Sequence, residues 1–250
     1  MTVRPGVGVP ALRGSPLFTR VLGVVHSPQA TFEAVARTPR WFGVMALTVL
    51  VTAGSSAILL RTEVGQLALL DRWERMASAF GLEIDDIQYA AMEDASRHGA
   101  SYAVVSALVA GPLLALGVSV ALFAAFRAGR SAFTGHPAVT YRQVFAVVAH
   151  AGLILALRQV VAAPVAYVRE TLASPVTIGM FFGMPNEASI PARLFGVIDL
   201  FILWWVIVLA IGMSVLSQRP APRLAIAFVG TYLALAAALT IAMVVAGGTA

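Results

Sequence analysis

The sequence predicts an all-α, polytopic membrane protein with a bundle of five transmembrane helices. Of its 250 residues, 59% are hydrophobic and only 12% are charged, whereas a soluble domain carries about a quarter charged residues. The apolar residues gather into five stretches of membrane-spanning length, since about 20 apolar residues cross the hydrocarbon core as a helix. A helix also satisfies its own backbone hydrogen bonds in lipid.

The five predicted spans form a membrane domain over residues 41–246, followed by a short tail at 247–250. The first, second and fifth spans carry no charge, while the third contains Arg158 and the fourth contains Asp199. The first span begins too late to be an obvious signal peptide, so we expect it to remain in the protein. In chain order, the predicted spans cover residues 41–60, 101–126, 143–166, 194–217 and 224–246.

The basic residues predict an orientation in the membrane. All 17 are arginine, and ten lie in segments 1–40, 127–142 and 218–223, against six in 61–100 and 167–193. The positive-inside rule then places the N-terminus in the cytoplasm and the C-terminus outside the cytoplasmic (inner) membrane. The arginines are dispersed along the chain, so we predict no nucleic-acid partner. The composition, rich in Ala, Val and Leu without lysine, suggests a GC-rich bacterial genome.

Residues 1–40 form a predicted cytoplasmic arm with two short helices. Ser15-Pro16 and Ser27-Pro28 are helix start signals, because proline suits the first helical position. Apolar residues share one face of each helix, with arginines beside them. The helices either lie in the membrane interface or pack against the bundle. The candidate residues for docking a partner protein are Phe18, Arg20, Phe32, Arg37 and Arg40.

Two further segments lie between spans. Residues 61–100 show helical spacing up to Phe80, a break at Gly81 and a possible cap at Asp85 or Asp86, which predicts a helical hairpin over the outer face. Residues 171–186 are uncharged and too short to span, so they form either a re-entrant element or an apolar loop resting on the bundle. In the second span, Gly111-Pro112 predicts a kink.

Arg158 and Asp199 are the strongest candidate site. Arg158 lies eight residues, or about 12 Å, below the outer end of the third span, and Asp199 lies about 8 Å below that of the fourth. Opposite charges at similar depth on consecutive helices predict an intramembrane ion pair, which lowers the insertion cost of both. The pair is either a static contact that fixes helix register or a polar site for a proton, an ion or a headgroup.

Other candidate chemistry is sparse. His150 lies two helical turns before Arg158, so it is a possible polar neighbour on the same face and a conceivable proton-transfer group. Asp94 and His98 have metal-ligand spacing but no evident third ligand. The chain contains no cysteine and shows no phosphate-binding loop or nucleophile motif. We therefore expect no enzymatic activity, no cofactor and no bound metal.

Three blocks of the sequence resemble the Yip1-domain family of membrane proteins. Residues Val21–Pro39 contain a Ser-Pro and Thr-Phe pattern before the first span, and Tyr141–Leu157 resembles the family's opening of the third span. Residues Phe195–Gly212 match an "lDlF-x-lW" block that includes Asp199. Where the family commonly has tyrosine this chain has His150, and the usual proline near Ile154 is absent.

The resemblance implies five membrane helices with a cytoplasmic N-terminus. Eukaryotic relatives act in vesicle trafficking and bind prenylated Rab GTPases, a partner that a bacterial member would lack. The first functional hypothesis is therefore a non-enzymatic scaffold that contacts lipid, an unidentified membrane or cytoplasmic protein, or a second copy of itself. The alternative is a small permease or lipid-handling component with its polar site at Arg158 and Asp199. A cavity reaching this pair would favour the alternative, and a closed pair would favour the scaffold.

Overall fold

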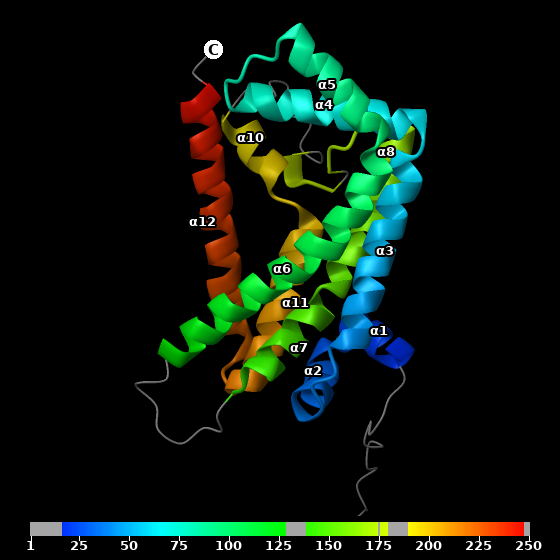
Figure 1. Cartoon of the computed structure of the whole chain (residues 1–250). Coiled ribbons are helices and arrows are strands. Elements are labelled where there is room, and N and C mark those ends of the chain that lie inside the picture. The colour runs from blue at the N-terminus through cyan, green and yellow to red at the C-terminus, as the bar shows by residue number, and fades with distance from the viewer. Residues whose placement is uncertain (1–16, 129–138, 175, 180–189, 248–250) are drawn as a thin grey trace, which may run out of the picture.

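The computed structural model describes residues 17–128, 139–174, 176–179 and 190–247, and these ranges are almost entirely helical (Figure 1). The one β-type feature within them is an isolated bridge between Thr177 and Asp199. In chain order, the helices are α1 Leu17–His26, α2 Pro28–Arg37, α3 Phe42–Leu60, α4 Glu63–Ala79, α5 Asp86–Arg97, α6 Gly99–Ala128, α7 Tyr141–Ala151, α8 Leu153–Arg169, α10 Ile190–Val197, α11 Leu200–Ser217 and α12 Ala221–Gly247.

The predicted all-α membrane bundle is confirmed. Within the described ranges, five helical segments are long and apolar enough to cross a membrane, and each falls on one predicted span. The third segment joins α7 and α8, which meet at Gly152 without a change to an extended chain. The five segments are Phe42–Leu60, Gly99–Ala128, Tyr141–Arg169, Leu200–Ser217 and Ala221–Ala242.

The bundle has a buried centre and lipid-facing outer helices. In the most apolar stretch of each span, 56% of the residues of α7–α8 and 44% of those of α11 are buried, against 6% for α6 and 11% for α12. The core includes Val147, Ile154 and Met213, from these central helices. Apolar side chains exposed over most of a helix mark a surface that another apolar phase covers. We therefore place α6 and α12 against lipid.

The two N-terminal helices pack against one end of the bundle, the end at which α11 and α12 meet (Figure 1). Pro28 opens α2, as predicted, although Ser27 makes no side-chain cap hydrogen bond. Phe32 and Val35 of α2 are fully buried, and Phe32 belongs to the main core. A Cβ atom at Gly212 of α11 would collide with Phe32 and Val147, so the helices approach closely because that position is glycine. The first Ser-Pro signal lies outside the described residues.

The predicted helical hairpin is formed by α4 and α5, which lie across the opposite end of the bundle (Figure 1). Gly81 ends the first helix with a positive φ of 70°, a conformation that glycine adopts without steric strain. Asp85, rather than Asp86, caps the second. Its side chain accepts a hydrogen bond from the Gln88 backbone, and the Gln88 side chain returns one to Asp85, a capping box.

The prediction of one continuous helix over 194–217 is wrong at its N-terminal end. The chain forms α10 up to Val197, leaves helical geometry at Ile198 and Asp199, and begins α11 at Leu200. Asp199 is thus at the junction of two helices and not inside one. The apolar composition of the segment conceals this break, because hydropathy carries no information on backbone geometry. By contrast, α6 continues through Pro112.

Candidate functional site

Asp199 caps the helix that follows it. Its Oδ1 atom accepts hydrogen bonds from the backbone nitrogens of Phe201, at 2.8 Å, and Ile202, at 3.3 Å. The first amides of a helix lack partners within the helix, and an aspartate at the N-cap satisfies them. The negative charge also lies at the positive end of the α11 dipole, which stabilises it.

The other carboxylate oxygen forms the predicted ion pair. The Nε atom of Arg158, on α8, donates a hydrogen bond to Asp199 Oδ2 over 2.8 Å. The hydroxyl of Ser174 donates a second hydrogen bond to the same oxygen. The Asp199 side chain is 4% exposed and that of Arg158 is 28% exposed. The carboxylate is therefore enclosed and fully hydrogen-bonded, whereas the guanidinium is partly open.

The segment that supplies Ser174 packs against the break in the fourth span. Ile178 donates its backbone hydrogen bond to Ile198, and Leu200 donates to Val176, both over 3.0 Å. These bonds satisfy backbone groups that the interrupted helix leaves without partners, as irregular backbone inside a membrane protein requires. The described part of the predicted 171–186 element thus contacts the site directly. Residue 175 and residues 180–186 lie outside the described ranges.

Tyr232, on α12, completes the hydrogen bonding of the break. Its hydroxyl accepts a hydrogen bond from the Asp199 backbone nitrogen over 3.0 Å and lies 3.5 Å from the carbonyl oxygen of Val197. The sequence reasoning missed both Ser174 and Tyr232. The available signal for Tyr232 was a hydroxyl within an otherwise apolar span, since such a group usually finds a partner when buried.

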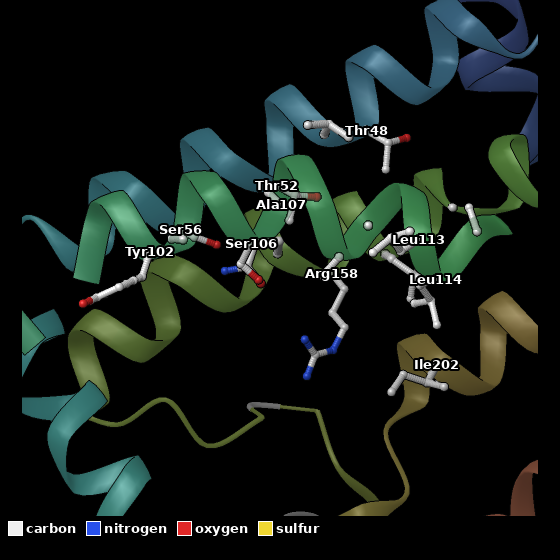
Figure 2. A pocket seen from close by; sticks show the side chains of 18 of the residues that line it. Thr48, Thr52, Ser56, Tyr102, Ser106, Ala107, Leu113, Leu114, Arg158 and Ile202 are labelled. Carbon is white, nitrogen blue, oxygen red and sulfur yellow. The ribbon is translucent and has the colours of Figure 1, made fainter. Parts of the chain in front are cut away.

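A cavity of about 1080 Å³ lies beside the ion pair (Figure 2). Its wall comes mainly from α3, α4, α6 and α8, with Ile202 and Trp205 from α11. Most of the lining is apolar. Arg158 is part of the lining, whereas Asp199 is not. The cavity also has a polar portion, which consists of Thr48, Thr52, Ser56, Arg72, Tyr102, Ser106 and Gln159.

His150 is not among the residues that line this cavity, although its neighbours Ala149 and Gly152 are. It is fully buried, and its Nδ1 atom lies 2.7 Å from the carbonyl oxygen of Ala146, which can only accept a hydrogen bond. Nδ1 therefore carries the proton. Its Nε2 atom has no hydrogen-bond partner within the part of the chain that the structure describes. The structure does not bring His150 together with Arg158 and Asp199.

The five candidate arm residues differ in exposure. Phe18 is 70% exposed on α1, and Arg37 and Arg40 are exposed. Arg20 is half-buried. Phe32 is fully buried in the core, so it holds α2 in place and offers no surface to a partner.

The Asp94 and His98 pair does not form a metal site. The His98 ring contacts the backbone oxygen of Asp94, at 3.3 Å, and not its carboxylate. Among the described residues, no three His, Cys, Asp or Glu side chains lie close enough together to bind an ion.

The five apolar spans and their lipid-facing surfaces define a multi-pass integral membrane protein. The Yip1 domain family model matches residues 22–243, which is most of the chain. The chain belongs to the Yip1 domain family. Searches of curated proteins and of solved structures found no match. The matched region contains the whole site, from the cavity to the break at Asp199.

Proposed function

We propose that this protein is a non-enzymatic, lipid-handling membrane protein that holds an amphiphile in the cavity between α3, α6 and α8. The observation that supports this proposal is that the Arg158–Asp199 pair is open to a cavity through Arg158. A pair that served only to fix the helices would be enclosed on both sides. Of the two hypotheses that the sequence raises, the geometry therefore favours the lipid-handling one.

The size and lining of the cavity fit a lipid-like molecule. Ligand pockets typically measure about 300–1,000 Å³ and combine apolar walls with a few polar groups that orient the ligand. This cavity, at about 1080 Å³, is slightly larger than that range. Its wall on one side is α6, in whose most apolar stretch only 6% of the residues are buried within the protein. An amphiphile from the bilayer therefore has only a short path to the cavity.

A cavity-filling substitution tests this proposal. Ala107 lines the cavity (Figure 2), whereas Leu108, the next residue on α6, is exposed without lining it. In Ala107→Trp the indole occupies the cavity, and in the matched control Leu108→Trp it projects from the helix surface. We expect Ala107→Trp to reduce binding of dioleoylglycerol several-fold, measured by native mass spectrometry of the purified protein, with Leu108→Trp unchanged.

The outcomes of that experiment separate the two functional hypotheses. Equal binding by both tryptophan variants would show that any bound amphiphile lies outside the cavity. No saturable binding by the natural sequence would contradict the lipid-handling function. Equal falls in the melting temperatures of both variants would identify an effect on folding. Binding is therefore expressed as the ratio of lipid-bound to lipid-free folded protein, so that unfolded protein does not count as loss of binding.

A scaffold function is the second candidate, and the exposed apolar face of α1 supports it. Leu17, Phe18, Leu22 and Val25 are exposed along this helix. The face would contact the membrane interface, an unidentified membrane or cytoplasmic protein, or a second copy of the chain. Substituting Phe18 with glutamate would remove such a contact without touching the core, and loss of a co-purifying partner or of the homo-oligomer would support this function.

We propose that the protein lies in the cytoplasmic membrane with its N-terminus inside. In Figure 1, α1 and α2 lie at the same end as the α11–α12 junction, and the α4–α5 hairpin and the C-terminus lie at the other end. Of the residues that the structure describes, the first end carries Arg20, Arg37, Arg40, Arg219 and Arg223, and the positive-inside rule assigns such an arginine-rich end to the cytoplasm. The hairpin, with its excess of acidic residues, then faces outward.

A further inference from the structure

The charges around the cavity indicate which amphiphile it selects. We propose that the cavity binds an amphiphile with an anionic headgroup, a carboxylate or a phosphate, and that Arg158 receives that headgroup. This inference rests on the proposed lipid-handling function and adds the chemical class of the ligand. Three observations support an anionic ligand: the sign of the lining charges, the hydrogen bonding of Asp199 and the distribution of polar groups along the cavity.

The cavity has a positive lining. Two arginines, Arg72 and Arg158, line it, and no aspartate or glutamate is among its lining residues within the described ranges. Asp199 balances the charge of Arg158 from behind, outside the lining. Arg72 is exposed, whereas the Arg158 side chain is only 28% exposed, so salt screens the charge of Arg158 less than that of Arg72. An anionic group in the cavity therefore meets only cations and neutral dipoles, while a cationic group meets like charge.

The bonds around Asp199 leave Arg158 able to accept a second anion. The carboxylate uses Oδ1 for two backbone amides and Oδ2 for Ser174 and for Arg158 Nε. Within the described part of the chain, Nε makes the one hydrogen bond of this guanidinium, so its Nη atoms keep their N–H donors. A guanidinium binds carboxylate or phosphate through such paired donors. Figure 2 shows the guanidinium projecting away from α6.

The polar groups are spread unevenly along the cavity, and this predicts the direction of the ligand: Thr48 lies in the same half as Leu113, whereas Ser56 and Tyr102 lie in the half nearer the α4–α5 hairpin (Figure 2). Arg72 and Tyr102 lie toward the α4–α5 hairpin, and Arg158 lies further along the cavity (Figure 2). Leu113, Leu114 and Val118 follow further along α6. The headgroup therefore lies in the half of the cavity nearer the hairpin, and the acyl chain extends toward the other half. Hydroxyls of Thr52, Ser56 and Ser106 suit the ester or phosphate oxygens of the ligand.

Two variants test the role of Arg158 while keeping the helix cap. Asp199→Asn removes the balancing charge, and asparagine still caps helices well. The double variant Arg158→Gln with Asp199→Asn replaces the ion pair by a neutral pair, and the net charge of the protein is unchanged. Glu74→Gln is the matched control for Asp199→Asn, since it also removes one negative charge but lies exposed on α4 outside the cavity.

The measurement compares amphiphiles that differ only in the headgroup. Dissociation constants for oleic acid and methyl oleate, and for dioleoyl phosphatidic acid and dioleoylglycerol, are determined by native mass spectrometry of the full chain in a non-ionic detergent. We expect the natural sequence to prefer each anionic member about tenfold, as charged hydrogen bonds predict. Asp199→Asn should increase that preference, the double variant should abolish it, and Glu74→Gln should leave it unchanged.

The binding data test the anionic selectivity and the lipid-handling function separately. Equal binding of anionic and neutral amphiphiles by the natural sequence overturns the anionic selectivity and leaves the lipid-handling function intact. Binding of neither class contradicts both. A preference that survives in the double variant shows that Arg158 is not the receptor. The carboxylate and phosphate arms together identify which headgroup binds more tightly.

Discussion

Tyr232 and Asp199 join the last span of the bundle to the break in the preceding one. The Tyr232 hydroxyl accepts a hydrogen bond from the Asp199 backbone nitrogen over 3.0 Å, while the side chain of Asp199 caps α11 and binds Arg158. One residue therefore contacts three helices, α8, α11 and α12, through three different groups. The break in the fourth span is a connected structural unit and not a local irregularity.

Tyr232→Phe should destabilise the protein, because it leaves the buried Asp199 amide without an acceptor. Loss of a partner for a buried backbone group costs about 1–3 kcal/mol. The measurement is the melting temperature of the purified protein in detergent. Tyr89→Phe is the control, since Tyr89 is exposed on α5, and it should leave the melting temperature unchanged. If the two variants melt together, the Tyr232 hydrogen bond does not contribute to stability.

Only part of this unit could be predicted from the sequence. The similar depth of Arg158 and Asp199 in their spans predicts that they pair, because two charges in apolar helices have few alternatives to pairing. The break was missed because LFGVIDLF reads as a continuous apolar run. Aspartate before a helix is an N-cap signal, but the requirement for a long span favoured the opposite interpretation. Ser174 comes from a segment that the sequence left as either a loop or a re-entrant element.

The N-terminal arm and the cavity show a second limit of sequence reasoning. Helical spacing correctly placed Phe32 on the apolar face of its helix, but it did not tell whether that face meets lipid, a partner or the bundle. Phe32 packs in the bundle because Gly212 leaves room for its ring, and this room depends on how α2 and α11 pack in the folded protein. The cavity likewise depends on how α3, α6 and α8 are spaced, and no residue pattern within one helix encodes that spacing.

Phe32 and Phe18 should respond differently to truncation. Phe32→Ala removes a fully buried ring from the core and should lower stability by about 3–5 kcal/mol, whereas Phe18→Ala acts on a side chain that is 70% exposed. Thermal unfolding in detergent measures both. Deleting the entire arm would thus unfold the bundle as well as remove a surface. A stable Phe32→Ala protein would show that α2 is not part of the folded core.

Gly212 should be sensitive to a single added methyl group. In a helix, Gly→Ala normally stabilises by about 1 kcal/mol, but a Cβ atom at Gly212 collides with Val147 and Phe32, and overpacking costs about 1–3 kcal/mol. Gly212→Ala should therefore lower the melting temperature. Gly230→Ala, where no atom lies within 4 Å of the new Cβ, is the matched control and should keep or raise it. A rise in both would show that α7 and α2 can move aside from α11 at Gly212 without loss of stability.

The orientation of the protein can be tested with single cysteines, because the chain contains none. Ile87→Cys lies on the exposed start of α5, and Thr38→Cys lies exposed after α2. With the N-terminus in the cytoplasm, a membrane-impermeant maleimide added to intact cells should label Ile87→Cys, and it should label Thr38→Cys only after permeabilisation. The unsubstituted protein controls for background labelling. The reverse pattern would mean that the arginine-rich end faces outward, against the positive-inside rule.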